Sequence, residues 1–195
     1  MRRSLVVSTP PTIEPVTLAE AKTHCRVDID DDDTLLERLI SSARVYCESV
    51  CRRAFIEQTL QLRCDSFPAE FRLPRPPFMS IASDGLKYYN TAGMLTTLAA
   101  SQYQTDVSSL VGRIVPAYGC SWPSARGQTD DVLVTYKAGF GATAALVPAP
   151  IRQAILMMVG HWYDHREPVV IGAPVANLPL AVDALLSDYR VREEI

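Results

Sequence analysis

The chain has 195 residues, of which 48% are hydrophobic and 21% charged, and its formal net charge is −3. This balance is typical of a folded globular protein and excludes an intrinsically disordered one. The charge also argues against tight nucleic-acid binding, which needs a surplus of Lys and Arg; the pairs Arg2-Arg3 and Arg52-Arg53 are too short to follow a phosphate backbone.

The first predicted elements are an arm and two helices. Prolines in residues 8–15 indicate an extended arm, and Thr17 with Glu20 forms a capping-box pattern that predicts a helix over 18–25. Acidic residues then precede a strongly amphipathic stretch, which predicts a long helix over 34–52. Acids at its start and Arg52 and Arg53 at its end suit the helix dipole.

Residues 55–140 have the pattern of strands rather than helices. Alternating runs at 58–64 and 132–136 predict two strands, and 101–107 and 114–122 are weaker candidates. The proline-rich run 73–77 cannot lie inside a central strand, because proline donates no hydrogen bond, so we expect a rigid connector or an edge there.

The C-terminal part is again helical. Apolar spacing predicts a long helix over 149–166, which Pro168 ends, then a loop over 169–178 and a short helix over 180–189. The expected fold class is α+β: one domain with a small core of about four helices, over 15–54 and 147–190, and a β-rich insertion over 55–140. The two long helices should meet through a set of apolar residues, namely Leu39, Ala43, Cys47, Ile155 and Val159.

The last segment, a predicted docking tail over 178–195, carries a short amphipathic helix with little core of its own to cover. A helix of about ten residues is marginal alone in water, so we expect it to become ordered by packing on another protein. Deleting 178–195 should then leave a folded body.

His161 and His165 are the strongest candidates for metal chemistry, because a spacing of four places both imidazoles on one helix face. The glutamate of a zinc protease motif is missing, and no third ligand is evident, so ordinary interface or surface histidines are the favoured interpretation. Cys47 and Cys51 share a helix face too and fit small buried hydrophobes better than ligands. A metal-dependent enzyme that uses these four residues remains the alternative function.

Other chemical motifs are incomplete or missing. Asp28, Asp30 and Asp32 match the start of a calcium loop, but Asp33 replaces its glycine and Leu39 its final glutamate. There is no nucleophile elbow, phosphate loop or dinucleotide fingerprint. The five cysteines, an odd number without framework spacing, indicate reduced thiols in a cytoplasm. We therefore expect no catalytic residue, metal or cofactor, and no apolar run long enough to span a membrane.

The order of several short motifs resembles one family. These motifs are Leu18-Ala19-Glu20-Ala21-Lys22, Cys25-Arg26-Val27-Asp28, Gln58-Thr59, the proline-rich run 73–77, the stretch 134–141, Val147-Pro148-Ala149-Pro150-Ile151 and the run 163–167. Together, over about residues 15 to 168, they are similar to the head-tail connector (adaptor) proteins of long-tailed double-stranded DNA phages and of the gene transfer agents derived from them.

The resemblance implies a structural, non-enzymatic virion protein made in the bacterial cytoplasm. It implies a ring, commonly a dodecamer, at the head-tail junction beneath the portal, which continues the DNA channel. The implied partners are the portal protein, neighbouring adaptor subunits, a stopper or other tail-side connector, and double-stranded DNA that passes without tight binding. The candidate portal or neighbour-subunit interface comprises seven residues: Leu185, Leu186, Tyr189, Arg190, Arg192, Trp162 and Tyr163.

Overall fold

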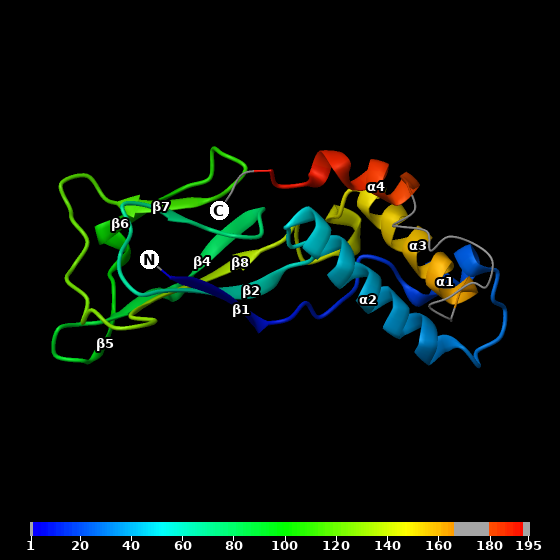
Figure 1. The fold of residues 1–195 in the computed structure, drawn as a ribbon, viewed down its shortest axis with the longest axis horizontal. Coiled ribbons are helices and arrows are strands. Elements are labelled where there is room, and N and C mark those ends of the chain that lie inside the picture. Colours follow the sequence, from blue (N-terminus) through cyan, green and yellow to red (C-terminus); the bar gives the residue numbers. More distant parts are fainter. Residues whose placement is uncertain (1, 166–179, 193–195) are drawn as a thin grey trace. The chain divides into compact units, whose positions relative to one another are not determined.

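The computed structural model describes residues 2–165 and 180–192. These residues form two compact units, a β unit over 2–11 and 57–141 and a helical unit over 12–56, 142–165 and 180–192. Four helices and antiparallel sheets confirm the expected α+β class, with the β-rich region between the second and third helices (Figure 1).

The β unit contains a five-stranded antiparallel sheet in the order β1-β2-β8-β4-β5. Its strands are β1 (Arg3–Thr9), β2 (Gln58–Cys64), β4 (Phe78–Tyr89), β5 (Leu95–Thr97) and β8 (Val132–Ala138). The alternating residues of β2 and β8 follow the predicted pattern, with Leu60, Leu62, Val134 and Tyr136 buried. The edge strand β1 was not predicted. It is held in the sheet by antiparallel pairing with β2.

A three-stranded sheet, in the order β3-β7-β6, completes the β unit. It consists of β3 (Phe71–Arg72), β6 (Tyr103–Asp106) and β7 (Arg113–Pro116), so the two weaker strand candidates are confirmed in shortened form. Residues 73–77 connect β3 to β4 outside any strand, as expected. Phe67 joins the sheets, because its ring lies 6.1 Å from Phe71 and 5.4 Å from Tyr88.

The helical unit contains α1 (Leu18–Cys25), α2 (Asp33–Cys51), α3 (Ala149–Asp164) and α4 (Leu180–Leu186), followed by a 3-10 turn, η3 (Ser187–Tyr189). The capping box is present as predicted: the amide of Glu20 donates to the Thr17 hydroxyl, and Glu20 accepts from the Thr17 amide. Pro168 and the loop at 169–178 lie outside the described residues.

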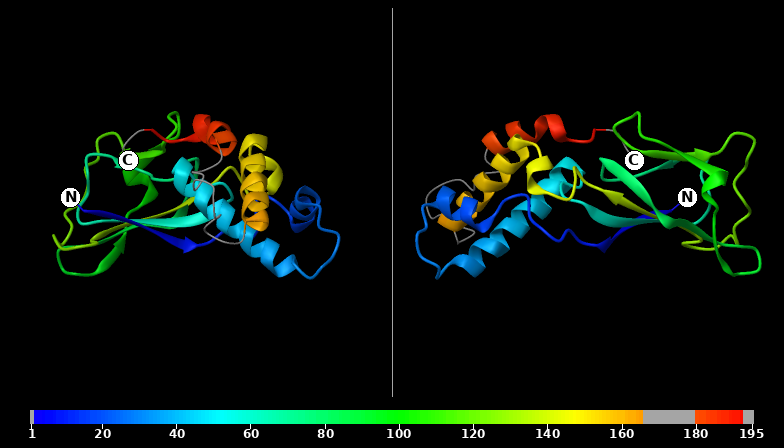
Figure 2. Two further views of the ribbon diagram at one scale, coloured as in Figure 1. Left: turned by 45° about the vertical axis from the view of Figure 1, so that its right-hand side comes forward. Right: turned by 180° about the vertical axis from the view of Figure 1, so that it is seen from behind.

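The predicted core between the two long helices is present. Helix α3 contacts α1, α2 and α4, and Figure 2 shows these helices side by side. Ala43, Cys47, Ile155 and Val159 are buried, whereas Leu39 is only half-buried. Leu36 and Ile40 instead supply the buried positions at that end of α2, one helical turn apart.

The expectation that the tail has little core to bury against was wrong. Val182 and Leu186 of α4 are fully buried, and Val191 is 4% exposed. Helix α4 packs on α3 and α2, and the amide of Val191 donates to the carbonyl of Cys51 at 3.0 Å. The apolar face of α4 is too short for periodicity alone to reveal this burial. Its partner surface is formed by α3 together with the end of α2, and the α2 part lies more than a hundred positions away in the sequence.

Candidate interaction surfaces

The candidate histidines form a pair without further ligands. Their ring centroids lie 4.9 Å apart, and Nδ1 of His165 lies 3.1 Å from the carbonyl oxygen of His161. Within 2–165 and 180–192, no three His, Cys, Asp or Glu side chains are grouped so that they could hold a metal. The geometry therefore provides two imidazoles at a helix end and no built metal site.

The helical thiols are buried. Burial raises the pKa of Cys47 to about 12 and that of Cys51 to about 11, so neither thiol gives a thiolate at neutral pH. The Cys51 sulfur lies 4.0 Å from the Leu186 carbonyl oxygen, inside the contact between α2 and the tail. Cys47 and Cys51 therefore lie in surroundings suited to small buried apolar side chains rather than to metal ligands.

The acidic residues before α2 have partners other than calcium. Lys22 Nζ lies 2.6 Å from an Asp30 oxygen and 2.7 Å from an Asp33 oxygen, and the Tyr163 hydroxyl donates to Asp32 at 2.5 Å. These contacts join α1, the loop at 28–31 and α3. Asp32 and Asp33 therefore help to fix the start of α2, while Asp28, Asp30 and Asp31 stay exposed.

The seven predicted interface residues occupy very different environments. Leu186 is fully buried in the chain's own core, so its side chain is not available to a partner in this conformation. Leu185, Tyr189 and Arg190 are half-buried, and Arg192 is exposed. On α3, Trp162 packs edge-to-face on Tyr46 with centroids 6.1 Å apart, and Tyr163 is half-buried beside Asp32.

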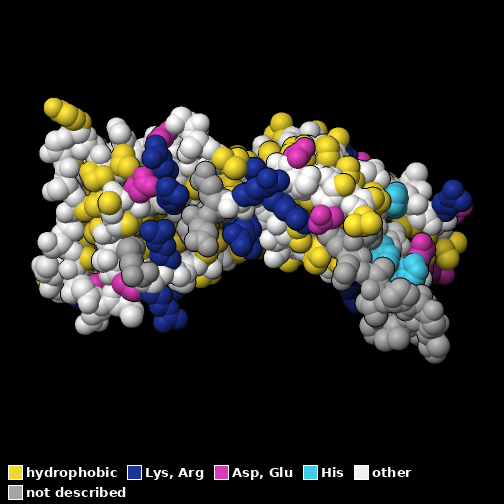
Figure 3. Space-filling model, turned by 45° about the horizontal axis from the view of Figure 1, so that its top comes forward, with side chains coloured by type: hydrophobic (Ala, Val, Ile, Leu, Met, Phe, Trp, Pro, Cys, Tyr) yellow, Lys and Arg dark blue, Asp and Glu magenta, His cyan; other side chains and the backbone are white. Residues whose placement is uncertain are grey.

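Four arginines gather where the tail meets the end of α2. Arg52 and Arg53 follow the last residue of α2, and Arg190 and Arg192 flank Val191, whose amide binds the Cys51 carbonyl. Arg53 Nε donates to the Tyr189 carbonyl, and Arg190 donates to Asp183. We call these four residues the arginine cluster. Sequence reasoning missed it because its halves lie about 140 positions apart; Figure 3 shows Lys and Arg side chains gathered in this region.

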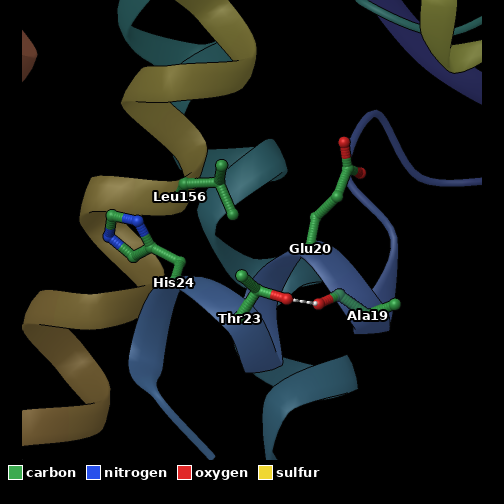
Figure 4. Close-up of a pocket in the computed structure, with 5 residues that line it drawn as sticks. All are labelled: Ala19, Glu20, Thr23, His24 and Leu156. Carbon is green, nitrogen blue, oxygen red and sulfur yellow. Dashed lines mark hydrogen bonds between the residues drawn. The ribbon is translucent and has the colours of Figure 1, made fainter.

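A hollow on the helical unit is lined by Ala19, Glu20, Thr23, His24 and Leu156 (Figure 4). It lies between α1 and α3. The helices approach closely here because Gly160 has no side chain; an added Cβ would lie 3.1 Å from the His24 ring. Glu20 also pairs with Arg152 of α3, so the wall of the hollow is held by an ion pair.

The β unit exposes apolar side chains at its loops and short strands. Met94 is 63% exposed, Val107 is 62% exposed and Tyr118 is fully exposed. Scattered exposed apolar residues are ordinary, but loop ends that carry them are suited to protein contacts. Among the described residues, no helix is both long and apolar enough to cross a membrane.

Comparison with known protein families identifies the class of protein that carries these surfaces. Residues 15–110, about half of the chain, match the model of the family described as phage gp6-like head-tail connector proteins. The chain belongs to this head-tail connector family, as the order of its motifs indicated. It is a structural protein of a virion or phage-like particle, placed where head and tail join.

Solved particle structures contain chains of the same fold. One, from the neck of an empty GTA particle computed with C6 symmetry, has a TM-score of 0.77 and 22% identity. Another, from the virion of a native gene transfer agent (GTA) particle, has a TM-score of 0.77 and 24% identity. Each alignment covers 100% of this chain and 98% of the other.

A third chain, from the neck of a native GTA particle computed with C12 symmetry, has a TM-score of 0.73 and 22% identity over the same shares of the two chains. Identities this low establish the shared fold alone. No curated protein matches the chain.

Proposed function

We propose that copies of this chain form a ring of twelve beneath the portal, which joins the DNA-filled head to the tail and continues the DNA channel. The observation that carries the proposal is the family match, together with a fold shared along the whole chain with chains from particle necks. Those necks were computed with C6 and C12 symmetry, and a ring of twelve copies is compatible with both.

A ring needs two different surfaces on each subunit, because a contact that closes by rotation joins unlike faces. The helical unit and the β unit each expose side chains suited to such contacts. Ile29 is 60% exposed and Leu146 57% exposed on the helical unit, and Met94 and Tyr118 are exposed on the β unit. These residues supply apolar area for neighbours without requiring a change of fold.

The portal and a stopper or other tail-side connector are the proposed partners above and below the ring. The exposed part of the tail, above all Arg190 and Arg192 with Leu185 and Tyr189, remains the proposed portal or neighbour contact. Trp162 and Tyr163 are proposed as a second part of it. Leu186 contributes indirectly, because it fixes α4 on the core.

The DNA is proposed to pass through the ring without tight binding. A subunit with a net charge of −3 lacks the surplus of cations that tight binding to phosphates needs, and each neutralised phosphate would slow the passage of the duplex. The proposed role needs no catalysis. No described residue set favours the metal-dependent enzyme alternative, since the histidine pair has no third ligand in the described part of the chain.

A deletion of the gene, complemented with plasmid-borne variants, tests this function. We expect DNA-filled heads without tails in the deletion strain and normal particles after complementation with the wild-type chain. Heads counted by negative-stain microscopy and packaged DNA measured by nuclease protection provide the two readouts. Tailed, infectious or transferring particles in the strain that lacks the chain would contradict the proposal.

A further inference from the structure

Helix α2 separates two exposed surfaces of opposite charge. Its C-terminal end carries the arginine cluster, Arg52, Arg53, Arg190 and Arg192, in which Arg52 and Arg192 are exposed. Its N-terminal end follows the acidic loop, residues 28–31, in which Asp28, Asp30 and Asp31 are exposed around Ile29. The helix has 19 residues, so the two surfaces lie about 28 Å apart within one subunit.

The arginine cluster has unused hydrogen-bonding capacity. Asp183 accepts from one Arg190 nitrogen, yet the Nε atom of Arg190 is buried and has no acceptor among the described residues. Asp188, the other carboxylate of the tail helix and turn, lies 3.4 Å from the Ser187 hydroxyl. A partner cannot reach that buried donor, but Arg52 and Arg192 are exposed and form no ion pair with another described residue. A guanidinium group is suited to binding a carboxylate through two parallel bonds, so these two side chains are the ones available to a partner.

The helix dipole explains only part of this arrangement. Dipole stabilisation acts within the first and last turns, which accounts for Asp33 and Arg52. Arg190 and Arg192 come from another segment, and Asp28 and Asp31 precede the helix without an ion pair to any other described residue. Ile29 is also 60% exposed, which a purely solvated acidic loop does not require.

We propose that the acidic loop of one copy binds the arginine cluster of the next copy. The two surfaces are complementary in charge, differ from one another and cannot meet within one chain, which makes the contact head-to-tail and suited to a closed ring. Ile29 adds an apolar centre to the contact. This inference rests on the proposed ring and names the surfaces that close it.

Cross-linking inside intact particles tests the contact. In a Cys120→Ser background, which removes the exposed native thiol, Asp31→Cys and Arg192→Cys are combined in one chain and the particles are treated with a short bis-maleimide. We expect a ladder of covalent multimers on a denaturing gel, since each copy links to two neighbours. Each single-cysteine variant should give no ladder.

Charge reversal provides a second test that does not depend on added thiols. We expect Arg52→Asp with Arg192→Glu, or Asp28→Arg with Asp31→Arg, to lower the yield of tailed particles by roughly tenfold or more, the effect of losing a contact of about 1.4 kcal/mol. Combining all four changes should restore most of the yield. The control Glu37→Arg with Arg38→Glu reverses two exposed charges on α2 and should leave the yield unchanged.

The outcomes separate the contact from the proposed function. If electron microscopy shows the chain as a ring in the neck, but the ladder is absent and the combined reversal restores nothing, the contact is wrong and the ring stands. If the neck contains no ring of this chain, the proposed function itself fails. A ladder together with restored yield supports both.

Discussion

The amide of Val191 donates a hydrogen bond to the carbonyl of Cys51 over 3.0 Å, and this bond ties the end of the chain to the end of α2. It lies beside Leu186, which is fully buried. The tail helix is therefore part of the helical core, and the surface that it presents to partners consists of its polar and half-buried residues.

Leu186→Ala should destabilise the protein strongly, because it leaves a cavity in a closed core. We expect a loss of about 2–5 kcal/mol in the free energy of unfolding, measured by urea denaturation. The matched control is Leu180→Ala on the same helix, whose side chain is 88% exposed and whose truncation should cost little. Equal stabilities for the two variants would contradict the packing of α4.

Removal of residues 178–195 should consequently unfold or weaken the helical unit rather than leave an intact body. The deletion exposes the surface that Val182, Leu186 and Val191 cover. Circular dichroism of the truncated chain measures the loss of helical structure, and limited proteolysis measures the loss of stability. A truncated protein as stable as the wild type would restore the earlier expectation of a tail that is ordered only by its partner.

Glu48 should be a stability residue, because its buried carboxylate links α2 to the segment that follows this helix. It accepts from Arg44 Nη1 at 2.9 Å and from the Phe55 amide at 2.7 Å, and it is 3% exposed. Glu48→Ala leaves Arg44 half-paired, at a cost of about 3–5 kcal/mol. Arg44 also binds Glu14, so Glu14→Ala, which removes a more exposed partner, should cost less in the same denaturation experiment.

The capping box should make stability depend on pH in the acid range. The Thr17 amide, which donates to its carboxylate, holds the pKa of Glu20 below its ordinary value of 4.5, with Arg152 acting in the same direction. Because the folded-state pKa is the lower one, this stabilisation is present above about pH 4.5 and is lost as the pH falls through the folded-state pKa. Glu20→Gln keeps an acceptor but cannot titrate, so its unfolding free energy should fall less steeply with acid.

Thiol reactivity should follow burial. Cys120 is exposed and should react first with a thiol reagent at pH 8, whereas Cys47, Cys51 and Cys64 are buried. Burial raises the pKa of Cys64 to about 11, so it too lacks a thiolate. Cys25, half-buried with a raised pKa, should react slowly. Rapid reaction of three or more thiols in the native protein would contradict this arrangement.

His161 and His165 should not confer metal-dependent stability. Melting curves of the wild type and of His161→Ala with His165→Ala should be unaffected by a chelator, because the pair has no third ligand in the described part of the chain. A large chelator-induced fall in melting temperature, seen in the wild type but not in the variant, would support the alternative hypothesis of a metal-dependent enzyme.

Local signals predicted the elements that local chemistry determines. The Thr17–Glu20 capping box predicted the start of α1, and the alternation of apolar residues predicted β2 and β8. The features that the sequence did not predict depend on residues far apart in the chain. Strand β1 is an edge strand fixed by pairing with β2, and the burial of Leu186 depends on α2 and α3. The arginine cluster likewise forms only when residues 52–53 and 190–192 meet.

Electron microscopy of the particle that carries the chain tests the central claim most directly. We predict twelve copies in a closed ring between the portal and the tail-side connector, with the duplex path through the ring's centre. Density for this chain elsewhere in the particle, or as isolated copies that do not surround the channel, would contradict the account.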